Sequence, residues 1–172
     1  CGFRIRASGE TDFPCITGAR VGKGRVYVKV DNRLNYDDWC EEIRNGRSYV
    51  SDGYAHIIDF AAETVGDNKQ EVRVGEDGSE MRLENYSNVR LTAKVAYLSD
   101  EVESIALEAI VNGYPVAKTD ILADGALNDV SMRIPVEKSS WVAFRIFPHA
   151  HSNPIFVIVD NKPIRPNRYS AE

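Results

Sequence analysis

Three histidines are the side chains in this sequence most suited to chemistry. His149 and His151 lie in PHAHSNP, between the apolar runs SSWVAFRIF and IFVIVD. Histidines two residues apart share one face of a strand, and imidazole nitrogens bind zinc in sites of three or four protein ligands. His56 is the only other histidine, so a histidine zinc site would need all three. Because Pro148 and Pro154 interrupt strand pairing, we favour a loop or bulge that holds structural histidines.

The other candidate groups are single polar residues near turns. Ser51 and Asp52 precede His56 in SYVSDGYAH, which offers a hydroxyl, a carboxylate and an imidazole along the chain. Beside Gly53, such residues are typical turn formers. The sequence contains no GxSxG nucleophile elbow, phosphate loop, HExxH or dinucleotide fingerprint. We therefore predict no catalytic residue within this chain.

The composition is that of one globular domain with a slight acidic excess. Of 172 residues, 43% are hydrophobic, and 21 basic against 26 acidic side chains give a net charge of −5. Without a basic block, binding to a nucleic-acid backbone is not expected. No apolar run approaches the roughly 20 residues of a membrane span, and no targeting segment is visible, so we expect a soluble chain of unassigned compartment. Because the sequence starts without methionine, we expect it to be part of a longer protein.

Three cysteines are too few for a disulfide framework. A bridge between Cys15 and Cys40 stays open as an alternative, but packed free thiols are the favoured interpretation, because free cysteine is commonly buried. The cysteines therefore do not indicate a compartment.

Short alternating or β-branched runs separated by turn signals predict an all-β, antiparallel, immunoglobulin-like sandwich. Leu91, Ala93, Val95 and Tyr97 alternate with polar residues, which predicts one buried face, and Asn112-Gly113 predicts a tight hairpin. The predicted strands are 25–31, 47–51, 55–60, 70–74, 88–98, 106–113, 114–121, 129–136, 140–147 and 155–160.

One segment instead predicts a short α-helix over about residues 36–45. Asn35 is an N-cap candidate, Asp38 lies in the first turn, and Gly46 follows the last helical residue. The apolar spacing predicts a stripe packed on the sheet, which makes Trp39 a core residue. The stripe comprises Tyr36, Trp39, Cys40 and Ile43.

Several blocks together resemble the C-terminal part of CehA/McbA-type metallohydrolases, which are related to PHP-domain amidohydrolases. The most specific blocks are YDDWCEEIRNGRSYVSDGYAH and SSWVAFRIFPHAHSNPIFV; GETDFP, GRVYVKV, LEAIVNGYPVA and NKPIRP agree in order and spacing. The resemblance covers nearly the whole chain. It implies that residues 1–22 are the end of a catalytic PHP-like barrel or an N-terminal extension, and that residues 23–172 are an accessory β-sandwich.

The resemblance also implies roles for individual residues. Asp12 matches an aspartate that ligates a divalent metal such as zinc, although Phe13-Pro14-Cys15 stands where a histidine often follows, and the remaining ligands would come from an N-terminal catalytic domain. His151 and Asn153 match the block ending in NPI. We expect His151 to fix its loop through a backbone hydrogen bond and His149 to be exposed.

The expected function is therefore non-catalytic support of a metal-dependent hydrolase, through contacts with the catalytic barrel or between copies in a homo-oligomer. Asp52, His56, His149, His151 and Asn153 are candidates for the rim of a pocket or an interface, provided that SDGYAH and PHAHSN lie at the same end of the sandwich. One alternative is a stand-alone carbohydrate- or peptide-binding module, and a less favoured one is a small metalloenzyme that uses the three histidines. The binding module would use an aromatic platform of Trp39, Tyr54, Tyr114 and Trp141.

Overall fold

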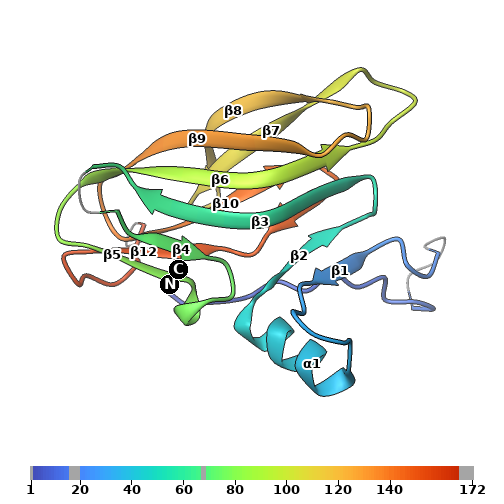
Figure 1. Ribbon diagram of the computed structural model, residues 1–172, viewed down its shortest axis with the longest axis horizontal. Helices are drawn as coiled ribbons and strands as arrows, with labels where there is room; N and C mark the ends of the chain where they lie inside the picture. The colour runs from blue at the N-terminus through green and yellow to red at the C-terminus, as the bar shows by residue number, and fades with distance from the viewer. Residues whose placement is uncertain (1, 16–19, 67–68, 167–172) are drawn as a thin grey trace.

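Two β-sheets face one another in the computed structural model, which describes residues 2–15, 20–66 and 69–166 (Figure 1). The smaller sheet has the strand order β4-β3-β6-β9. Its strands are β3 (Ala55–Thr64), β4 (Glu71–Arg73), β6 (Ser87–Tyr97) and β9 (Asn128–Val136). The chain is thus all-β with a single α-helix among the described residues, as predicted.

The larger sheet contains eight strands. One path runs β1-β2-β11-β10-β12-β5, while β7 pairs with the other side of β10 and β8 pairs with β7. All of these pairs are antiparallel except the parallel pair β12–β5. The strands are β1 (Arg25–Val28), β2 (Ser48–Ser51), β5 (Glu80–Leu83), β7 (Ser104–Val111), β8 (Tyr114–Leu122), β10 (Ser140–Ile146), β11 (Ala150–Ser152) and β12 (Ile155–Val159).

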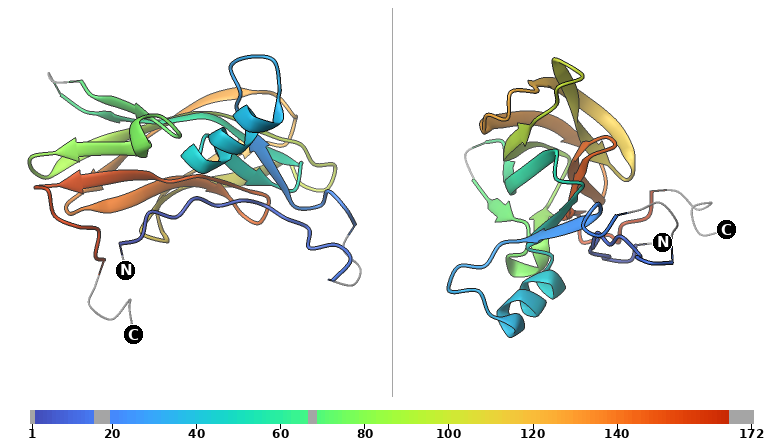
Figure 2. Two further views of the ribbon diagram at one scale, coloured as in Figure 1. Left: turned by 90° about the horizontal axis from the view of Figure 1, so that it is seen from below. Right: turned by 90° about the vertical axis from the view of Figure 1, so that its right-hand side faces the viewer.

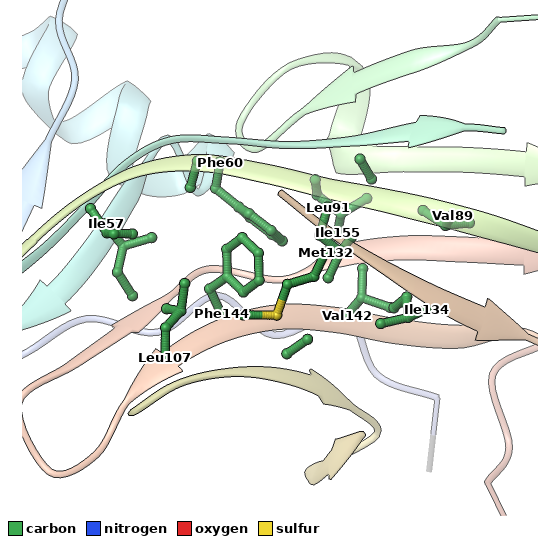
Figure 3. Packing of buried hydrophobic residues seen from close by; sticks show 14 of the residues in the cluster. Ile57, Phe60, Val89, Leu91, Leu107, Met132, Ile134, Val142, Phe144 and Ile155 are labelled. Atoms are coloured by element: carbon green, nitrogen blue, oxygen red, sulfur yellow. The ribbon is translucent and has the colours of Figure 1, made fainter. Parts of the chain in front are cut away.

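Side chains from the inner faces of both sheets form one core (Figure 3). Alternate residues of β6 point inward as predicted, and Leu91 and Val95 are fully buried. Phe60 from β3 meets Phe144 from β10 with ring centroids 5.2 Å apart, so the two aromatic rings join the sheets. Burial of each such side chain stabilises the fold by about 1.5–3 kcal/mol, which makes this core the main source of stability.

The predicted turns and caps are present. Asn112 and Gly113 have φ angles of 50° and 92°, as a two-residue hairpin between β7 and β8 requires. Helix α1 (Tyr36–Asn45) begins after Asn35, whose side chain accepts a hydrogen bond from the Asp38 backbone, and a left-handed Gly46 ends it. A short 3-10 helix, η1 (Asp77–Ser79), precedes β5.

The predicted packing of the helix stripe is wrong. None of the residues of α1 is buried, and Tyr36 is 76% exposed and stacks on Trp39. Figure 1 shows why: α1 lies beside β1, away from the space between the sheets. Trp39 is therefore a half-buried surface residue. Cys15 and Cys40 are both free thiols, but Cys15 is exposed rather than packed.

Residues 2–10, which we name the N-terminal strap, run extended along the outer face of the larger sheet (Figure 2). The Ala7 amide donates a hydrogen bond to Asn153 Oδ1 at 2.7 Å. Arg6 lies over the Phe156 ring, 5.9 Å from its centroid. The strap is thus attached to the sandwich through its backbone and its arginines. No helix within the described ranges is long and apolar enough to cross a membrane.

Candidate functional site

The two histidine-bearing segments lie together at one end of the sandwich. The Asp52 amide donates to the His149 carbonyl at 3.0 Å, which joins the turn after β2 to the turn after β10. The Asp52 Oδ2 to His149 Nδ1 distance is 2.7 Å. The condition that SDGYAH and PHAHSN share one end is therefore met.

His149 is half-buried, so the expectation that it is exposed is wrong. Its Nε2 lies 3.5 Å from the Tyr97 hydroxyl, and its ring packs against those of Tyr97 and Tyr54, with centroids 5.2 and 5.9 Å away. Because a carboxylate can only accept, a proton on His149 Nδ1 is donated to Asp52. This pairing orients the imidazole as in a catalytic dyad. Its Nε2, however, is directed at the buried Tyr97 rather than at an open reaction space.

His151 holds its own segment in place, as predicted. Its Nδ1 donates to the Ser152 carbonyl at 2.6 Å. Burial, aided by nearby Arg145, lowers the pKa of His151 despite this hydrogen bond, so the ring is neutral at pH 7. The predicted loop is only partly a loop, because Ala150–Ser152 form β11 between β2 and β10.

His56 belongs to a different cluster, which the sequence analysis missed. Tyr27 and Tyr49, paired across β1 and β2, stack with centroids 5.1 Å apart, and the His56 ring meets both edge-on. The Tyr49 hydroxyl lies 2.7 Å from His56 Nδ1. Burial raises the pKa of Tyr49 and lowers that of His56, so the phenol keeps its proton and donates a hydrogen bond to a neutral imidazole.

Asn153 links the strap to the sheet. It is 1% exposed, accepts from the Ala7 amide, and donates to the Ser48 carbonyl at 3.1 Å and to the Ser48 hydroxyl at 2.9 Å. A further donor contact of 3.3 Å reaches the Ala7 carbonyl. These bonds place Asn153 at an internal interface between strap and sandwich.

A groove of about 490 Å³ opens beside the two turns, and we name it the histidine groove. Asp52, His149 and His151 line one part of it, while Glu10 and Lys23 approach from the N-terminal segment. Lys23 makes no ion pair within the described part of the chain. Arg25 and Arg145 also line the groove, but the Arg145 guanidinium is paired with Glu108 at 2.7 Å.

A second hollow, of about 220 Å³, lies where β1 and β2 diverge from β3. Tyr27, Tyr49 and Ile57 line it, and the ion pair between Lys29 and Asp59 lies at the same place, 2.6 Å apart. Its polar lining atoms already have partners, so it would favour an apolar group. To predict this hollow from the sequence, one would have had to know that residues 25–28 pair with residues 48–51.

The residues that the structure describes do not fit a metal centre. His56, His149 and His151 have separate partners, and the described ranges contain no group of three His, Cys, Asp or Glu side chains placed to hold an ion. Asp12 is exposed in a turn, where its carbonyl accepts from the Cys15 amide at 2.9 Å. Its role as a ligand beside groups from another domain stays a prediction.

The four aromatic residues of the suggested platform do not form one surface. Tyr54 lies beside His149, at one end of β10, while Tyr114 lies at the other end, next to the hairpin near Trp141. Trp39 is on α1.

In comparisons with known proteins, no family model, curated protein or solved structure matches this chain.

Proposed function

We propose that this chain is a non-catalytic β-sandwich that supports the catalytic domain of a metal-dependent hydrolase of the CehA/McbA type. The observation that carries this proposal is the inverted polarity of the N-terminal strap. Arg4 and Arg6 face the sandwich, whereas Phe3 and Ile5 are 77% and 71% exposed. An extended segment normally turns its apolar side chains toward the core that it covers.

The contacts of the arginines explain why the strap keeps this orientation. Arg4 pairs with Glu80 and lies 5.6 Å from the centroid of the Phe156 ring, and Arg6 Nε donates to the Asn45 carbonyl at 2.7 Å. Cation–π and charge-assisted contacts of this kind are specific in geometry. The apolar side chains are therefore held outward, which suits a segment that lies between two domains.

The histidine groove gives such a partner domain a second point of contact. Gly9 and Glu10, at the end of the strap, line the groove, so a domain that extends along the strap from Phe3 and Ile5 would reach it. Lys23 and Arg25, which line the groove, would complete a pocket for a substrate that carries an oxyanion. The described residues supply no metal ligand set, so the metal and the bond-breaking step belong to the partner domain in this proposal.

The hollow beside Tyr27 and Tyr49 favours a second candidate function. A stand-alone binding module would place an apolar group of its ligand there, rather than on the four aromatic residues suggested by the sequence. Enlarging a half-buried lining side chain by Val28→Phe would then abolish ligand binding, without any effect on attachment of a catalytic domain.

The support function is tested with Phe3→Ser/Ile5→Ser. In this chain alone, the exposed side chains contribute little, and we expect the free energy of unfolding to change by less than about 0.5 kcal/mol. In a natural polypeptide that includes the catalytic domain, each covered side chain would contribute about 1.5–3 kcal/mol to domain contact. We therefore expect a lower melting temperature and weaker metal-dependent hydrolytic activity.

The matched control is Tyr86→Ser, which removes a 57% exposed aromatic side chain elsewhere on the surface. It should leave the stability of the chain alone unchanged, and both the stability and the activity of the longer polypeptide unchanged. Equal behaviour of the strap variant and this control in the longer polypeptide would refute the proposal. Hydrolysis by the isolated chain after metal loading would refute its non-catalytic role.

A further inference from the structure

The outer edge of β8 is open. Among the strands that the structure describes, β8 pairs only with β7. Tyr114, Val116 and Leu122 are 71%, 49% and 63% exposed. An open edge presents unpaired backbone groups that can accept another strand, and exposed apolar side chains favour this pairing. Figure 1 shows β8 along the upper margin of the molecule, where no other element covers it.

Two copies of β8 that run antiparallel would place side chains of opposite charge across from one another. Around Thr119, Lys118 lies opposite Asp120. Lys118 and Asp120 are exposed, and neither makes an ion pair within the described residues. Antiparallel pairing of two copies about Thr119 would therefore create two Lys118–Asp120 pairs. Such cross-strand pairs stabilise a sheet, whereas like charges opposite one another destabilise it.

We propose that β8 pairs with β8 of a second copy of this chain, about a two-fold axis at Thr119. The interface is isologous, because each copy contributes the same strand, and it joins the two eight-stranded sheets. This inference does not depend on the proposed function.

Local features of β8 fix the extent and register of this contact. The register with β7 shifts between Ala109 and Ile110, which leaves Val116 as the extra residue of a bulge after Pro115. Proline lacks an amide proton, and a bulge bends an edge away from a partner. Regular pairing is thus limited to residues 117–121, which are centred on Thr119.

The other open edge on this side of the molecule, β9, is less suited to self-pairing. Asp129 and Arg133 would be opposite one another about Ser131, but Asp129 already pairs with Lys94 at 2.8 Å. Pro135 interrupts the outer hydrogen-bonding positions of the same strand. This contrast makes β9 a matched control for experiments on β8.

The charge pattern can be tested by sedimentation of the full chain over a range of concentrations. We expect a dimer whose dissociation constant rises about tenfold to a hundredfold in Asp120→Lys, because two attractive pairs become repulsive. The swap Lys118→Asp/Asp120→Lys restores opposite charges across the axis and should restore the dimer. Arg133→Asp on β9 should have no effect. A monomer up to about 1 mM, or equal loss in the single variant and the swap, overturns the proposal.

A cross-link tests the register. After the native cysteines have been replaced by serine, Thr119→Cys should form an intermolecular disulfide under mild oxidation, because directly opposed strand residues lie within the Cα distance that a disulfide spans. Ser131→Cys on β9 is the matched control and should remain reduced. Equal cross-linking at the two positions, or a dimer that does not cross-link through position 119, overturns the β8 interface.

Discussion

Replacement of Asn153 is expected to detach the N-terminal strap. The buried amide has four hydrogen-bond contacts, two with the Ala7 backbone and two with Ser48, and its two N–H hydrogens are shared among three acceptors. Each bond contributes about 0.5–1.5 kcal/mol, and exposure of Ala7 to water offsets part of the loss. We therefore expect Asn153→Ala to lower the free energy of unfolding by about 2–4 kcal/mol in urea denaturation. Asn153→Asp should cost more, because it directs a charge at two carbonyl oxygens.

A strap deletion separates the contribution of Ala7 from that of Ser48. In a chain that lacks residues 1–8, Asn153→Ala should cost about 1–2 kcal/mol less, since the two bonds to Ala7 are already absent. Amide exchange of Ala7 should accelerate in the full-length variant. Asn88→Ala, an exposed strand substitution, should change stability by less than about 0.5 kcal/mol. An equal cost of Asn153→Ala in both backgrounds would show that this residue does not hold the strap.

Three further predictions concern the turns and histidines. Asp52→Asn should lower the free energy of unfolding by about 1 kcal/mol, because a neutral amide replaces the carboxylate that accepts from His149; thermal denaturation measures this, and an unchanged melting temperature would contradict the pairing. Burial lowers the pKa values of His56 and His151, so the unfolded chain binds protons more readily than the folded chain, and the free energy of unfolding should fall as the pH drops below about 6.5. His151→Asn should reduce this pH dependence. An equal change of stability with pH in the variant would contradict the role given to His151. Gly113→Ala should cost about 1 kcal/mol, because φ is 92° but no atom lies closer than 3.9 Å to the added methyl group; a cost above about 3 kcal/mol in urea denaturation would indicate a clash instead.

Local sequence patterns predicted most of the elements, because their causes are local, but the short strands β5 and β11 were not among the predicted strands. The Asn35 cap, the left-handed Gly46 and the Asn112-Gly113 hairpin each depend on a few adjacent residues. The inward alternation along β6 depends on a period of two residues. The immunoglobulin-like arrangement specified in that prediction stays a prediction, since strand order depends on contacts between distant segments.

The candidate site was harder to predict, because its contacts connect distant parts of the sequence. Asp52 and His149 are 97 residues apart, and nothing in either segment identifies the other as its partner. Trp39 was placed in the core because its spacing matches an amphipathic helix, but spacing does not reveal which surface the helix faces. The Tyr27–Tyr49 stack required knowledge of which strands pair.

The two proposed contacts use opposite parts of the larger sheet. The strap crosses β12 and meets Glu80 of β5, whereas β7 and β8 lie on the other side of β10. A second copy joined through β8 therefore does not compete with a domain that covers Phe3 and Ile5. Substitutions at these positions share no contacts with Lys118 or Asp120, so their effects on domain contact and on dimer formation should be independent. A sandwich with both contacts would hold two catalytic domains apart on a continuous sheet.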